Sequence, residues 1–198
     1  MARTTLSDEL KDAIAGMPIR VKDKLLMRLV AKDDKLVEQL RFRLIENGET
    51  TEERRDECSA FIPEYLDSFA EHSYFSAGRL LSLLRHTSGR ITYHVQVTGD
   101  KYGEVSLNLE MLLYTLNEYG STFPYNDSRK LRTLTTYMVK RVQKIIGLIK
   151  KLHEDYQLDF MDDLKQLGTL IANTNSLRGK AVELGLDTKS LAQGDFPD

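Results

Sequence analysis

The chain has 198 residues, of which 28 are Lys or Arg and 30 are Asp or Glu, so its formal net charge is −2. Apolar residues make up 41% and charged residues 29%, which is typical of globular domains and excludes collagen-like, low-complexity and wholly disordered chains. Four prolines, twelve glycines and no tryptophan disfavour a β-sandwich, which needs frequent turns.

Cysteine content and hydropathy predict the compartment. Cys58 is the only cysteine, so the chain cannot form an internal disulfide and gains nothing from an oxidising compartment. The N-terminal residues are already polar and acidic by Asp8, whereas a signal peptide needs an apolar stretch there. The longest strongly apolar patch, 145–149, is far shorter than the ~20 residues that cross a bilayer. We therefore expect a cytoplasmic protein with no membrane association.

Three short helices are predicted in the N-terminal part. Ser7 can cap the first, and Pro18 can open the second, whose apolar residues recur every three or four positions. Asp33 or Asp34 can cap the third, and Asn47-Gly48 can close it in a left-handed conformation. Helices joined by so few residues are expected to pack as an antiparallel hairpin.

The next segment predicts two longer helices. Thr50 and Glu53 have the spacing of a capping box, so a helix begins there. Pro63 removes a hydrogen bond and clashes with the preceding turn, and we expect the helix to kink or restart at this point. The apolar run 80–84 predicts another helix, which is expected to end near Ser88-Gly89.

Residues 91–109 fit two structures. Ile91 and Val97 belong to one alternating apolar run and Val105 to another, and the turn between them contains Gly99, which is a β-hairpin pattern. The surroundings are helical, however, and an isolated two-stranded hairpin needs packing partners in water. Both a β-hairpin and a helix are therefore kept for this segment.

The clearest pattern covers about 128–156. Its apolar residues are spaced by three or four positions and form a heptad-like stripe, and Asp127 or Ser128 can cap the helix. The stripe consists of Leu131, Leu134, Met138, Val142, Ile145, Ile149, Leu152 and Tyr156. We expect a mainly α fold, a bundle or short solenoid of antiparallel helical hairpins around this long helix. One helical domain over 1–192 is predicted, followed by a flexible tail over 193–198.

Catalytic and cofactor patterns are not recognisable. No phosphate-binding glycine loop occurs, and no two histidines have the i,i+4 spacing of metal ligands on one helical face. His86 and His94 would share a face only on a continuous helix, and Ser88-Gly89 is expected to break it. Cys58 follows two acidic residues, which disfavour a reactive thiolate. We therefore expect no catalytic residue, cofactor or metal site.

Charge segregation is the feature that points to function. Residues 127–151 hold eight basic side chains and one acidic, and the basic ones lie opposite the apolar stripe. A solvated helix face usually mixes charges of both signs. The candidate partner-binding face consists of Arg129, Lys130, Arg132, Lys140, Arg141, Lys144, Lys150 and Lys151.

Three sources of negative charge could neutralise this basic face. They are the acidic segment 44–71 of the chain itself, an acidic partner protein or second copy of the chain, and nucleic acid. The slightly negative net charge disfavours a dedicated nucleic-acid binder. We expect a non-enzymatic helical protein–protein interaction or scaffold module that can self-associate. Nucleic-acid binding through the 128–151 helix is the alternative, and an enzyme with a distributed pocket is the third.

Overall fold

The computed structural model describes residues 5–70, 75–124 and 128–194, and the secondary structure of these residues is helical throughout. The chain divides into two compact units, unit 1 (Met1–Gly48) and unit 2 (Glu49–Asp198). The expected mainly α fold is confirmed. The single domain over 1–192 stays a prediction, and residues 195–198 of the predicted tail lie outside the described residues.

Unit 1 consists of α1 (Asp8–Ala15), α2 (Ile19–Val30) and α3 (Asp34–Leu44). Two predicted caps are confirmed: Ser7 Oγ accepts the Leu10 amide at 3.3 Å, and Asp33 Oδ1 accepts the Leu36 amide at 3.1 Å. Asn47 and Gly48 both have positive φ, as expected for the end of α3. Local side-chain chemistry therefore sets these helix ends.

Unit 1 buries little of its apolar surface. Neither α1 nor α2 has a buried residue, and Phe42 is the buried residue of α3. Leu44, the last residue of α3, and Ile45, which follows it, are 72% and 75% exposed. The apolar periodicity of this unit predicted helices correctly, but in the single chain it does not produce a core.

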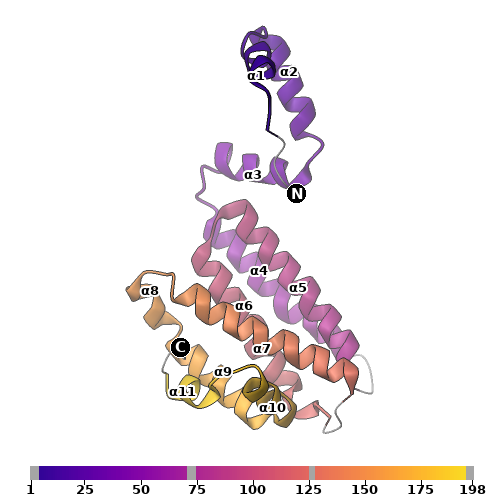
Figure 1. Ribbon diagram of the computed structural model, residues 1–198, viewed down its shortest axis with the longest axis vertical. Coiled ribbons are helices and arrows are strands. Elements are labelled where there is room, and N and C mark those ends of the chain that lie inside the picture. Colours follow the sequence, from indigo (N-terminus) through magenta and orange to yellow (C-terminus); the bar gives the residue numbers. More distant parts are fainter. Residues whose placement is uncertain (1–4, 71–74, 125–127, 195–198) are drawn as a thin grey trace. The chain divides into compact units, whose positions relative to one another are not determined.

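Unit 2 is a helical bundle (Figure 1). Its α-helices are α4 (Thr51–Leu66), α5 (Ala77–Thr98), α6 (Lys101–Tyr119), α7 (Arg129–Ile149), α8 (Glu154–Asp159), α9 (Met161–Asn173), α10 (Asn175–Glu183) and α11 (Thr188–Gln193). Helix α6 packs against α4, α5, α7 and α9, while α10 packs on α7 and α11 on α9. Because these pairs include helices that are not neighbours in sequence, the unit is a bundle and not a solenoid.

The predicted β-hairpin near 91–109 is wrong, because both of its arms are helical. The first arm is the C-terminal part of α5 and the second is the N-terminal half of α6. The turn was located correctly, but it joins helices: Gly99 ends α5 with φ of 79°, and Asp100 caps α6. Along α6, buried residues occur on several sides, including Val105, Leu107 and Leu109. A helix enclosed by four others loses its 3.6-residue pattern, which explains the misleading alternation.

Helix α7 is shorter than the predicted helix over about 128–156. Ser128 caps it, with its Oγ accepting the Leu131 amide at 3.2 Å, and the helix ends at Ile149. The stripe is buried from Leu131 to Ile149. After a turn the chain continues as α8, where Tyr156 is 53% exposed, before Phe160 becomes buried again. The heptad spacing therefore continues beyond the true helix end.

Two expected interruptions are not breaks. Helix α4 runs through Pro63 to Leu66 without restarting, and α5 runs through Ser88-Gly89 to Thr98. Ser88 is buried against neighbouring helices, whereas Gly89 is exposed. A glycine costs an α-helix only about 1 kcal/mol relative to alanine, which tertiary packing overrides.

Candidate functional site

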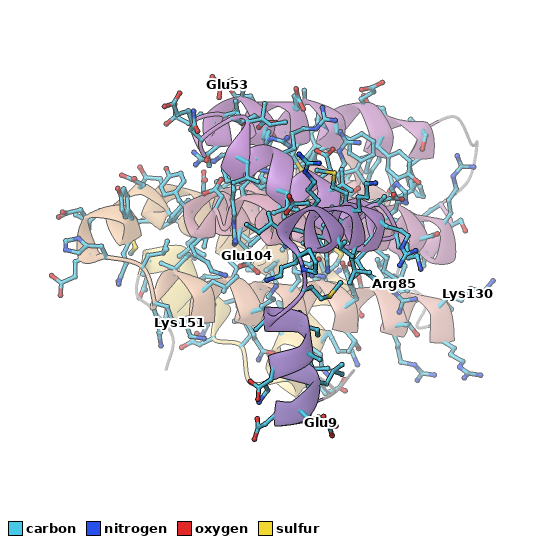
Figure 2. All side chains as sticks on the ribbon, turned by 90° about the horizontal axis from the view of Figure 1, so that it is seen from above. Glu9, Glu53, Arg85, Glu104, Lys130 and Lys151 are labelled. Carbon is cyan, nitrogen blue, oxygen red and sulfur yellow. The ribbon has the colours of Figure 1, made fainter. Side chains whose placement is uncertain are left out.

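The basic face lies along the outside of α7. Seven of its eight residues are exposed, and Arg141 is half-buried. Figure 2 shows Lys130 and Lys151 near opposite ends of α7, with Arg85 on the neighbouring α5. The eight side chains therefore do not form one patch. They divide into an N-terminal group (Arg129, Lys130 and Arg132), a central group (Lys140, Arg141 and Lys144) and a C-terminal group (Lys150 and Lys151).

The central group is held by α6. Arg141 donates to Asn108 Oδ1 at 3.3 Å and to the Tyr137 hydroxyl at 2.9 Å, and its guanidinium lies 5.2 Å from the centre of the Tyr137 ring. Lys144 Nζ lies 2.9 Å from Glu104 Oε1. The acidic partner of Lys144 is therefore on α6 and not in the segment 44–71, whose helix α4 packs mainly against α5 and α6.

The N-terminal group contributes to a groove between α5 and α7. Its volume is about 460 Å³. We call it the arginine groove, and it is lined by Arg85, Arg129, Arg132, Thr133, Thr136 and Tyr137. Three arginines from two helices therefore line it, and none of these six described residues carries a carboxylate.

The floor of the arginine groove is fixed by Tyr137. Its hydroxyl donates to the Leu84 carbonyl oxygen at 3.3 Å and accepts from Arg141. These bonds connect α7 to α5 next to Arg85, and they orient the ring in a half-buried position. The groove is thus built on two packed helices and does not depend on a loop.

The positive charges in the first turn of α7 are unfavourable for the stability of this helix. Its first turn has no acidic residue, whereas Arg129, Lys130 and Arg132 are all within the first four positions. The N-terminus is the positive end of the helix dipole, where each cation is disfavoured by about 0.3–1 kcal/mol. A bound anion would relieve this repulsion, so the charge distribution favours an anionic ligand at this end.

Arg85 is the site residue that sequence reasoning missed. It lies on α5, directly after the apolar run 80–84 and 44 positions before Arg129. No local pattern connects the two residues, because only the packing of α5 against α7 brings them to one groove. An exposed arginine among buried leucines was the available signal.

The histidines and the cysteine are arranged differently from expectation. Because α5 is continuous, His86 and His94 both line a second cavity, between α4 and α5, together with Cys58. Cys58 is buried, and this burial raises the pKa of its thiol. Among the described residues no group of three or more His, Cys, Asp or Glu side chains is placed to hold a metal ion.

Within the described ranges, no helix combines the length and apolarity needed to cross a membrane. No known protein family, no curated protein and no solved structure matches this chain.

Proposed function

We propose that this protein is a helical interaction module that binds an acidic segment of a partner protein in the arginine groove. The observation that carries the proposal is the convergence of Arg85, Arg129 and Arg132 on one groove whose six lining residues include no carboxylate. A module of this kind needs no catalytic residue. Its cytoplasmic location stays a prediction from the single cysteine.

The side chains of the groove suit carboxylates. A guanidinium group presents a planar set of N–H donors that matches a carboxylate in a bidentate arrangement. Thr136 adds a hydroxyl group beside it, and the Tyr137 ring provides an apolar wall for the methylene groups of Glu. Specificity would then come from the fixed spacing of the three arginines along two packed helices.

Nucleic acid remains the alternative ligand, and the charge distribution makes it the weaker one. Proteins that bind DNA commonly neutralise about 6–10 phosphates, whereas the arginine groove offers three guanidinium groups. Beyond Lys151, the segment 152–198 holds four basic and nine acidic residues, which would repel a backbone that extended past the C-terminal end of α7. A short acidic peptide avoids this repulsion.

A binding experiment tests the groove directly. A fluorescein-labelled deca-glutamate peptide is titrated with the full chain, and binding is followed by fluorescence anisotropy. Reversal of Arg85 and Arg132 to Glu should weaken binding at least about tenfold, since each charge-assisted bond contributes about 1.5–3 kcal/mol. The matched control is reversal of Lys150 and Lys151, which makes the same charge change at the other end of α7 and should leave the affinity within about twofold.

The outcomes separate the groove from nonspecific attraction. Equal weakening by both double variants would mean that only net charge matters, and the groove proposal would be wrong. Tighter binding of a 20-nucleotide oligo-dT than of the peptide, with a steep salt dependence, would favour the nucleic-acid alternative. Thermal melts of all variants confirm that loss of binding does not reflect unfolding.

We also infer that the module self-associates through unit 1, with a second copy of the chain as the partner. The apolar side chains that α1 and α2 leave exposed are Leu10, Ile14, Ile19, Val21, Leu26, Met27 and Leu29. Helices as short as these are marginal in water without a packed apolar face. The charges are complementary between copies: α1 holds three acidic and one basic residue, and α2 holds four basic and one acidic.

A further inference from the structure

A second cavity lies between the antiparallel helices α4 and α5, and it shares no lining residue with the arginine groove. Its volume is about 570 Å³. From α4 it is lined by Arg54, Glu57 and Cys58, and from α5 chiefly by His86, Arg90 and Val97. We propose that this cavity binds a small molecule with an apolar body and one carboxylate group.

The charge of the ligand follows from the two arginines. Arg54 is half-buried in the cavity wall, and Arg90 crosses from α5 to α4, where its guanidinium lies 4.1 Å from the centre of the Phe61 ring. Stacking on a ring leaves the edge of a guanidinium group able to donate, and the hydrogen-bond partner of Arg90 here is the Cys58 thiol, a weak acceptor that a carboxylate would replace. With Glu57 as the acidic residue in the described lining, the cavity has an excess of positive charge.

The apolar body of the proposed ligand is inferred from the other residues that line the cavity. Cys58 and Val97 are buried in it, and the raised pKa of Cys58 keeps the thiol neutral, so that it behaves as a small apolar side chain. His86 also lines the cavity, and its ring stacks on that of Tyr65, with 4.6 Å between the ring centres. Ligand sites commonly combine such apolar walls with a few polar groups.

A metal ion fits this cavity poorly, although it contains two histidines and a cysteine. His94 Nε2 lies 3.1 Å from Asp100 Oδ2, so this nitrogen already has a hydrogen-bond partner. The Arg54 and Arg90 cations would repel a divalent ion, and a protonated thiol is a poor ligand. The same two cations attract a carboxylate.

The test uses octanoate as the probe and 1-octanol as its uncharged counterpart. Because Cys58 is the only cysteine, its alkylation by iodoacetamide reports on the cavity itself. We expect octanoate to bind in calorimetric titrations and to slow the alkylation of Cys58. We expect 1-octanol to bind at least about tenfold more weakly, since it lacks the charge-assisted hydrogen bonds.

Three variants make the test specific. Arg90→Gln and Arg54→Gln should each weaken octanoate binding about tenfold or more, and the second is informative even if the first disturbs the packing of α4 on α5. Arg178→Gln removes the same charge from an exposed position on α10, which lines neither cavity, and should leave octanoate binding unchanged. The proposal is overturned if octanoate does not bind at about 10 mM, if 1-octanol binds equally well, or if Arg178→Gln has the same effect.

Discussion

Asp100 connects three helices of unit 2 through one carboxylate. It accepts from Arg55 Nε at 2.7 Å, from the Gly103 amide at 2.8 Å and it lies 3.1 Å from His94 Nε2. Burial would raise the pKa of Asp100, but the hydrogen bonds from His94, Arg55 and the Gly103 amide together lower it to about 2. The Asp100 carboxylate is therefore ionised in the folded protein, and its protonation should lower the free energy of unfolding.

Asp100→Asn should destabilise unit 2 by about 1.5–3 kcal/mol at pH 7, because Arg55 loses its charged partner. The pKa is lower in the folded than in the unfolded protein, so this stabilisation is present above about pH 4 and is lost as the pH falls towards 2. Urea unfolding at several pH values should therefore show the difference between wild type and variant shrinking on acidification. A difference that does not change with pH would contradict this role of the charge.

Two glycines should respond to alanine with opposite signs. A Cβ on Gly103 would lie 2.1 Å from Asp100 Oδ2, so Gly103→Ala must displace the carboxylate and should cost about 1–3 kcal/mol. Gly147 lies on the exposed side of α7 with nothing within 4 Å of its Cβ position, and Gly147→Ala should stabilise by up to about 1 kcal/mol. Thermal melts measure both effects. If both variants were more stable than the wild type, helix propensity alone would govern these positions.

At the scale of elements, α7 provides the clearest test of the heptad stripe. Ile145 is fully buried, so Ile145→Ala should cost about 2–5 kcal/mol through lost burial and the cavity that remains. Tyr156 continues the same spacing but lies in α8 and is half exposed, and Tyr156→Ala should cost clearly less. Denaturant unfolding of both variants measures this difference. Equal costs would mean that the stripe is buried over its full predicted length.

At the scale of the whole molecule, the proposed self-association through unit 1 can be tested by charge substitution. Leu10→Asp together with Ile14→Asp places charge on the exposed apolar face of α1. If unit 1 pairs with a second copy, light scattering coupled to size exclusion should show a dimer for the wild type and a monomer for this variant. Its unit 2 should melt as in the wild type.

The control for this experiment lies on unit 2. Val182 is 76% exposed on α10, so Val182→Asp also places a charge at an exposed apolar position. This variant should remain dimeric. A wild type that is monomeric at every concentration, or a Leu10/Ile14 variant that stays dimeric, would exclude self-association through unit 1.

Part of the candidate site was predictable from sequence. Arg129 and Arg132 were expected on the outer face of a basic helix, and they lie there. The third arginine of the groove, Arg85, was not expected, and neither was the ion pair between Lys144 and Glu104. Both features depend on which helices pack against α7. Helical periodicity determines which side of a helix faces solvent, but it carries no information about the neighbouring helix.

The sequence by itself determined the helix starts and the buried stripe of α7. Ser7, Asp33 and Ser128 cap the helices they were expected to cap, because a cap acts on amides two or three residues away. Tertiary structure decided that the segment 91–109 is helical, because burial of α6 on several sides hides the helical period there. It decided the position at which α7 ends, since the chain turns after Ile149 and Phe160 is buried again. It also decided both cavities, since each is lined by residues of two helices that meet through packing.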